Sequence, residues 1–412
     1  MKLNLPIVIS SAKSAALATD RNDAFRMASQ MSSRNLSISA LFFATILIVA
    51  QLDGQTLLIK SPLDYQVFQR LTRLRGVVNV RGRALEEIDR VDVHISGRSI
   101  TGALPGTWQR FRLKHPSDEF ECNVHVAAGG FYRIDLQLRR GNHIAGTSTI
   151  PHVGVGEVFL ISGQSNSTNY GEVLQKVQTG MVVTFDGDSW RVADDPQPGT
   201  QDNSKKGSFI PSFGDALYRK YGVPIGIASV GHGSTSVRQW LPVGELVEVM
   251  PTMTKYISQN PKGDLISDGT LFSGMMKRMQ QLGPHGFRAV LWHQGESDSH
   301  QAPEHEIDAA TYRRMLEQVI ACSRKEAGWH IPWFVAQASY HTPEDPSTLE
   351  IRQVQRSLWQ SGTALQGPDT DTLTALYRQD NGRGTHFNDA GLKAHGLLWA
   401  QAVEEWLDQV LH

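Results

Sequence analysis

The sequence predicts an α/β fold with a mostly parallel sheet, preceded by a small β-sandwich domain. Two observations lead to this fold class. After Gly156, short apolar runs typical of buried strands alternate with amphipathic stretches typical of helices. Before Gly156, the chain consists of short segments in which apolar residues such as Val91, Val93 and Ile95 alternate with polar ones, and turn residues separate the segments.

The chain of 412 residues is too long for one average domain. We expect a leader over residues 1–50, a β-sandwich accessory domain over 56–153 and a catalytic domain over 154–412. In the catalytic domain the expected strands are residues 157–163, 225–231, 288–295 and 331–339. The expected helices are residues 209–221, 271–282, 309–326 and 390–411.

Residues 36–50 form an apolar stretch that is short for a membrane span and suits the hydrophobic region of a signal peptide. Arg34 supplies the positive flank, and Ala50 is a suitable small residue for cleavage before Gln51. The pattern predicts a secreted or periplasmic protein without stable membrane insertion after cleavage. An uncleaved segment would instead anchor the protein to the membrane.

Charge and cysteine content exclude several classes of protein. Lysine and arginine total 40 against 41 for aspartate and glutamate, so no field draws the chain to nucleic acid. Cys122 and Cys322 lie in regions assigned to different domains, which predicts that they share no disulfide. The sequence indicates no cofactor.

One segment carries residue types that bind metals. His300 and His305 lie near Asp298 and Glu304, but their spacing is irregular and the segment reads as a solvated loop. We therefore expect no metal site there.

Polar residues follow three of the expected strands. They form Gly-Gln-Ser-Asn at 163–166, Gly-His-Gly-Ser at 231–234 and His-Gln-Gly-Glu-Ser-Asp at 293–298. Because ligands of open parallel sheets bind outside the carboxyl ends of the strands, these segments predict the site. Ser165 follows a strand through a glycine, which suits either a nucleophile or a helix N-cap. The base that a serine nucleophile needs is assigned to His386, in a loop before the last helix.

Four motifs, in this order, carry a resemblance to a known family: GQSN after a strand, GHGSTSVRQW, LWHQGESD and THFNDAGL. They resemble the sialate O-acetylesterase-like and acetylxylan-esterase branch of the SGNH hydrolases. The resemblance extends over residues 154–412 and includes the preceding sandwich. It implies a three-layer α/β/α fold and removal of O-acetyl groups from sugars.

The resemblance also implies roles for individual residues. Ser165 is the expected nucleophile and His386 the base and later acid. The expected oxyanion donors are the backbone N–H groups of Ser165 and Gly233 and the side chain of Gln294. Two of these residues have simpler readings, since Gly233 suits a turn and Gln294 a hydrogen bond that holds the loop.

The carboxylate that would orient His386 is not fixed by the motifs, because Arg383 stands where many SGNH enzymes have an aspartate. We favour Asp380, which shares a glycine-containing loop with His386. Glu296 and Asp298 are alternatives on the neighbouring strand end. A Ser-His dyad without a carboxylate is the fourth option.

The expected partner is an O-acetylated carbohydrate of the sialic acid or xylan type. Asn166, Trp240 and Arg238 are the expected substrate-binding residues, and Trp190 and Tyr170 are further aromatics suited to stacking on sugars. The alternatives are a short-chain lipase-like carboxylesterase and a catalytically silent carbohydrate-binding protein. Labelling of Ser165 by an organophosphonate distinguishes the enzymes from the silent protein.

Overall fold

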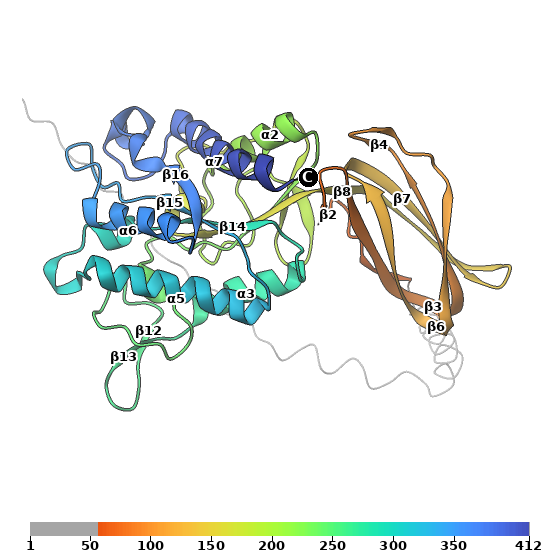
Figure 1. Ribbon diagram of the computed structural model, residues 1–412, viewed down its shortest axis with the longest axis horizontal. Helices are drawn as coiled ribbons and strands as arrows, with labels where there is room; N and C mark the ends of the chain where they lie inside the picture. The colour runs from red at the N-terminus through yellow and green to blue at the C-terminus, as the bar shows by residue number, and fades with distance from the viewer. Residues whose placement is uncertain (1–56, 412) are drawn as a thin grey trace, which may run out of the picture. The chain divides into compact units, whose positions relative to one another are not determined.

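A computed structural model describes residues 57–411, and its C-terminal part is built on one central sheet (Figure 1). All neighbouring strands of this sheet run parallel except the pair β9 and β10. The strands follow one another across the sheet as β10 (Trp190–Val192), β9 (Val182–Phe185), β11 (Ile225–Ser229), β8 (His143–Gly163), β14 (Ala289–His293), β15 (Trp333–Gln337) and β16 (Leu365–Asp369).

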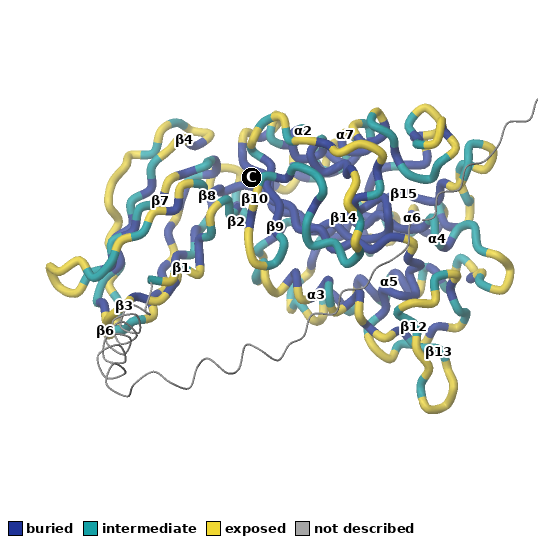
Figure 2. Tube along the Cα trace, turned by 180° about the vertical axis from the view of Figure 1, so that it is seen from behind, coloured by how far each residue is buried: buried dark blue, intermediate teal, exposed yellow. Residues whose placement is uncertain are grey.

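The strands of the central sheet are apolar because both of its faces are covered. Every residue of β9, β11, β14 and β15 is buried, as is the last part of β8 from Val153 onward. Figure 2 shows β9, β14 and β15 in the dark blue of buried residues. Such continuous burial leaves only the strand ends to carry polar chemistry.

Helices cover both faces of this sheet (Figure 1). Helices α2 and α7 belong to the core cluster of one face, and α3, α5 and α6 belong to that of the other. Left-handed glycines end two of them, Gly222 after α2 and Gly328 after α5. The helices are α2 (Ile210–Tyr221), α3 (Thr270–Leu282), α4 (Glu296–Ser299), α5 (Ala309–Ala327), α6 (Leu349–Gln360) and α7 (Asp389–Val410).

The N-terminal part is built from long antiparallel strands. Strand β3 pairs with β6 and β7, and β7 pairs in turn with β8. Alternate residues such as Val78, Val80, Val91 and Val93 are buried, as the alternating pattern predicts. The main strands are β1 (Leu58–Ser61), β2 (Val67–Gln69), β3 (Arg75–Ser96), β6 (Trp108–Ala127) and β7 (Gly129–Arg140).

Strand β8 belongs to both parts of the fold. It pairs with β7 up to Val155 and with β11 and β14 from Glu157 onward. The predicted domain boundary at 153/154 therefore falls within one continuous strand.

A buried ion cluster lies where β8 enters the central sheet. Glu157 is fully buried and accepts hydrogen bonds of 2.7 Å from Nε of both Arg70 and Arg288. Arg70 follows β2 and Arg288 precedes β14, so the cluster links the N-terminal strands to the central sheet. Removing one member would leave an uncompensated buried charge.

The prediction of a mixed α/β fold is confirmed, and the eight expected helices and strands of the C-terminal part are present. Their ends shift by a few residues, except that the expected strand 157–163 is the last part of β8, which begins at His143. Strands β9, β10 and β16 of the central sheet and helices α4 and α6 were not expected from the sequence. Cys122 and Cys322 are both free thiols. No helix within residues 57–411 is long and apolar enough to cross a membrane. The predicted leader and its cleavage position lie outside the described residues.

Candidate active site

Ser165 stands on a tight turn at the carboxyl end of β8. Gly163 has φ +124°, and a Cβ there would lie 2.0 Å from the carbonyl oxygen of His293 on β14, so only glycine fits. The next residue, Gln164, donates its N–H to the same carbonyl at 2.9 Å. Ser165 then begins a short 3₁₀ helix. The strand pairing thus fixes the serine at the edge of the sheet.

His386 stands on a loop between η6 (Asp380–Gly382) and α7. The buried guanidinium of Arg378 fixes this loop by donating hydrogen bonds to the carbonyl oxygens of Thr385 at 2.7 Å and Leu373 at 2.6 Å. Asn388 caps α7 by accepting the N–H of Gly391. His386 is therefore anchored on both sides.

The serine turn and the histidine loop meet through Asn166. Its side-chain amide donates to the carbonyl oxygen of Thr385 at 3.3 Å and to Oε1 of Glu296 at 2.9 Å. The residues that directly follow Ser165 and precede His386 are thus hydrogen-bonded to each other. This contact gives Asn166, predicted to bind substrate, a bridging role within the protein.

Tyr170 lies between His386 and the loop after β11. Its ring centroid is 5.0 Å from that of His386, and a Cβ at Gly233 would lie 2.6 Å from the tyrosine hydroxyl. The Tyr170 ring is therefore in contact with Gly233 on one side and near His386 on the other. The absence of a side chain at Gly233 leaves room for the ring.

The partner of the His386 ring is an amide. Nε2 of Gln379 lies 2.8 Å from Nδ1 of His386, and the Gln379 N–H donates to the His386 carbonyl at 3.0 Å. The oxygen and nitrogen of a glutamine amide are interchangeable by a flip that the hydrogen-bond network decides. No other hydrogen bond within residues 57–411 fixes this amide, so Oε1 can face an Nδ1–H equally well.

Asp380 does not hydrogen-bond the His386 ring in this geometry. Asp380 and Asn381 both have left-handed backbone conformations, with φ of +55° and +56°. The predicted fold-back of the loop is present, but it brings the residue before Asp380 to the imidazole. The sequence reading missed Gln379 because it searched for a carboxylate, although the same glycines allow either residue to reach back.

Glu296 is held by two neighbours. Its Oε1 accepts hydrogen bonds of 2.9 Å from Nε2 of His293 and from Nδ2 of Asn166. Burial favours the neutral acid, but the charge and hydrogen bond of His293 and the bond from Asn166 outweigh it and lower the pKa of Glu296 to about 2. The ionised carboxylate acts on His386 through its charge, without a hydrogen bond to the ring.

Asp298 is committed to a buried network away from His386. Its carboxylate accepts from the hydroxyl of Ser236 at 2.5 Å, the N–H of Val237 at 2.8 Å and Nε2 of Gln294 at 2.6 Å. Arg238 lies 3.4 Å from it. The carboxylate therefore orders the loop after β11.

Two predicted substrate-binding residues are corrected by their burial. Arg238 and Trp240 are each 0% exposed. The guanidinium of Arg238 contacts the carboxylate of Asp298 and donates hydrogen bonds to the carbonyls of Val249 and His305. Trp240 packs edge-on against Trp292. Side chains enclosed in this way have no surface to offer a sugar.

The predicted oxyanion donors are differently placed. The Gly233 N–H donates to Oδ2 of Asp202 at 2.6 Å, so a carboxylate occupies this donor. Gln294 is 0% exposed and donates to Asp298 and to the carbonyl of Thr235, which gives it the alternative role of holding the loop. Sequence reasoning missed Asp202, which lies in a loop without a recognisable motif.

The surroundings of His386 favour its neutral form. Burial lowers the pKa of His386 below the ordinary 6.5, and the charges of Lys206 and Arg378 act in the same direction. Glu296 and Asp380 oppose them. A neutral imidazole is the form that accepts a proton from a serine hydroxyl.

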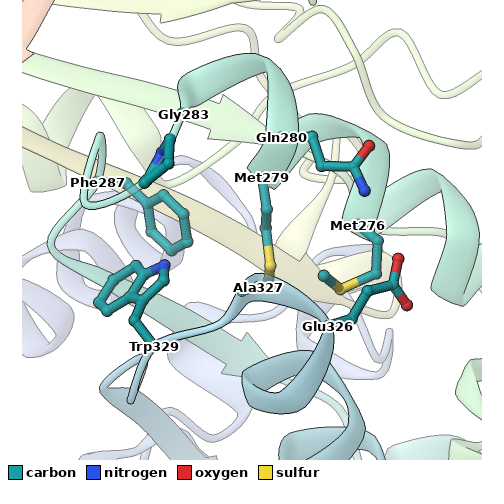
Figure 3. A pocket seen from close by; sticks show the side chains of 9 residues that line it. Met276, Met279, Gln280, Gly283, Phe287, Glu326, Ala327 and Trp329 are labelled. Atoms are coloured by element: carbon teal, nitrogen blue, oxygen red, sulfur yellow. The ribbon is translucent and has the colours of Figure 1, made fainter.

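A separate apolar cavity of about 180 Å³ lies between the ends of α3 and α5 (Figure 3). Met276, Met279, Phe287 and Trp329 are among its lining residues, and none of the predicted site residues borders it. Neither Ser165 nor His386 lines this cavity, so it is separate from the candidate active site.

One protein family, described as "Carbohydrate esterase, sialic acid-specific acetylesterase", matches residues 155–405. The match covers more than half of the chain and contains Ser165, Gly233 and His386. A search of curated proteins found no match.

The chain is also similar to solved structures. A carbohydrate acetylesterase from Xanthomonas citri is 18% identical, with a TM-score of 0.53 over 83% of this chain and 73% of that chain. A protein from Arabidopsis thaliana is also 18% identical, with a TM-score of 0.42 over 60% of this chain and 98% of that chain. At this level of identity the first likeness supports the fold alone.

Proposed function

The chain belongs to the sialic acid-specific acetylesterase family of carbohydrate esterases and is a carboxylic ester hydrolase; from this premise we propose that it removes O-acetyl groups from carbohydrates through an acetyl-enzyme on Ser165. The observation that carries the proposal is the meeting of the Ser165 turn with the His386 loop through Asn166. The sugars are of the sialic acid or xylan type.

In the first half-reaction Nε2 of His386 takes the proton of the Ser165 hydroxyl while Oγ bonds to the acetyl carbonyl carbon. The tetrahedral intermediate collapses, the ester bond to the sugar breaks, and His386 gives its proton to the departing sugar oxygen. A water molecule then attacks the acetyl-enzyme with His386 again as base. Acetate leaves and Ser165 recovers its proton.

Gln379 positions His386 for these transfers. Nε2 accepts a proton only when Nδ1 carries the ring hydrogen, and that hydrogen needs an acceptor. The side-chain oxygen of Gln379, placed at the 2.8 Å contact, accepts it. Glu296 stabilises the imidazolium by its charge. Asp380, the carboxylate predicted from the sequence, remains the alternative acceptor.

The oxyanion is stabilised by the backbone N–H groups of Ser165 and Gly233. The second donor becomes available when Asp202 swings away, because a carboxylate and an oxyanion repel each other. Ser204, which donates its backbone N–H to the other oxygen of Asp202 at 3.1 Å, lies on the same loop and would move with it.

We also propose the arrangement that the family resemblance implies: a three-layer α/β/α SGNH domain preceded by a small β-sandwich, exported by its N-terminal signal. N-terminal sequencing of secreted material tests the export. A mature terminus near Gln51 is expected, and an intact Met1 in a cytoplasmic fraction would contradict it.

Acetate release from O-acetylated sialic acid, acetylated xylan and a synthetic acetyl ester tests the function, with Ser165→Ala as the matched variant. We expect release from at least one acetylated sugar and a loss on the order of a thousandfold in the variant. Preference for long acyl chains, or equal release by both proteins, would overturn the proposal.

A further inference from the structure

Three potential metal-ligating side chains gather away from Ser165 and His386. Ligand atoms of His300, His341 and Asp345 all lie within 4.8 Å of one another. His300 follows α4, and His341 and Asp345 lie on the loop between β15 and α6. Residues 298–305 alone did not reveal this set, because two of its members come from the next strand's loop.

The tautomer of His300 is set by its surroundings. Its Nε2 lies 3.1 Å from the carbonyl oxygen of Ser339 and 3.2 Å from Oγ1 of Thr348. Thr348 donates its own hydroxyl hydrogen to the carbonyl of Ser299 at 3.1 Å, so both atoms facing Nε2 are acceptors. Nε2 therefore carries the hydrogen, and a backbone carbonyl fixes the ring as it does for many metal-bound histidines.

The other ring nitrogen of His300, Nδ1, consequently carries a lone pair, and this lone pair faces a carboxylate. Nδ1 lies 3.2 Å from Oδ2 of Asp345. Two acceptors at this separation repel each other unless a positive charge lies between them. A metal cation held between Nδ1 and the carboxylate would supply that charge, and a second imidazole stands close enough to serve as a third ligand.

That second imidazole belongs to His341, whose ring lies 4.3 Å from the His300 ring with an angle of 21° between the planes. The loop that carries His341 is anchored at its start by hydrogen bonds to Asp371. Asp371 accepts the N–H groups of Ser339 and Tyr340 at 2.8 and 3.0 Å. His300 and the start of the loop are thus rigid, while Asp345 stands on the exposed part.

We propose that His300 Nδ1, His341 and Asp345 bind a divalent metal ion of the zinc class. Two imidazoles and a carboxylate are ligands that Zn²⁺ accepts, and the exposed side leaves further positions for water. With bonds of about 2.0–2.1 Å to a tetrahedral ion, ligand atoms lie about 3.4 Å apart. Nδ1 of His300 and Oδ2 of Asp345 are already 3.2 Å apart, so the main change on binding would be a turn of the His341 ring out of its stacked position, which would aim a ring nitrogen at the ion.

Zinc titration of chelator-treated full-length protein by calorimetry tests the site, with His341→Ala and Asp345→Asn as variants. Both residues are exposed, so neither change disturbs the fold. His152→Ala is the matched control, because Nδ1 of His152 also lies 3.1 Å from a carboxylate, that of Asp64, without a second histidine.

We expect one zinc ion to bind the wild type with micromolar affinity and binding at least about tenfold weaker in each variant, as for loss of one ligand or its support. The His152→Ala protein should bind as the wild type does. Absence of binding by the wild type would leave His300 and Asp345 as an ordinary ion pair and overturn the proposal. Equal binding by all four proteins would overturn it as well. Neither result depends on esterase activity.

Discussion

The side-chain amide of Gln379 lies 2.8 Å from Nδ1 of His386, at the place where serine hydrolases of the triad type put a carboxylate. In the proposed mechanism the amide is flipped, so that its oxygen accepts the ring hydrogen but brings no charge. Gln379 would then orient the imidazole, and the charge of Glu296 would stabilise its protonated form.

Gln379→Ala should lower kcat by about 10- to 100-fold with little change in KM, because the imidazole loses its orientation while the substrate contacts stay. Gln379→Glu should keep activity and move the acidic limb of the pH profile to higher pH, since a carboxylate raises the pKa of His386. Asp380→Asn is the control and should stay near wild type. A large loss in Asp380→Asn with an unaffected Gln379→Ala would return the role to Asp380.

The acidic limb of kcat/KM should lie below pH 6.5 in the wild type. Burial lowers the pKa of His386, so the catalytic base stays neutral to more acidic pH than a free histidine does. Rates measured from pH 4 to 8, with a substrate that does not titrate, check the direction. A limb above 6.5 would show that Glu296 outweighs burial.

Asp202→Ala should raise kcat/KM for a synthetic acetyl ester by about tenfold. The Gly233 N–H is then free for the oxyanion, and a hydrogen bond to a charged group is worth about 1.5–3 kcal/mol. Asp202→Asn should give a smaller gain, because the amide still accepts the N–H but carries no charge. A loss in both variants would mean that Asp202 supports the turn after β11 in its active form.

Arg238→Ala should lower the free energy of unfolding by about 3 kcal/mol or more, because Asp298 is left as a buried unpaired charge. Urea unfolding measures the change, and Arg356→Ala, at an exposed arginine on α6, is the control with an expected change within about 0.5 kcal/mol. In buffer without urea, where the Arg238→Ala protein is folded, its KM should not be higher than that of the wild type. A raised KM with unchanged stability would restore Arg238 to substrate binding.

The parallel strands were predicted well from the sequence because a short apolar run such as Ala289–His293 is typical of a strand buried on both faces. The sequence predicted Ser165 from a motif at a strand end and His386 from a motif in the loop before the last helix. It did not predict that Arg238 and Trp240 are enclosed, since a polar motif after a strand does not reveal which side chains turn inward. Gln379 and Asp202 depend on how two loops fold back, and loop contacts have no periodic signal.

The most direct test of the account is the covalent state of Ser165. Incubation with a fluorophosphonate, followed by mass spectrometry of the digested protein, should show one adduct per chain, located on Ser165. The Ser165→Ala protein should show none, and Ser167→Ala, which changes the neighbouring serine that donates to the Gln164 carbonyl, should still be labelled. Activity in the wild type without an adduct, or an equal adduct in Ser165→Ala, would contradict the assignment of the nucleophile.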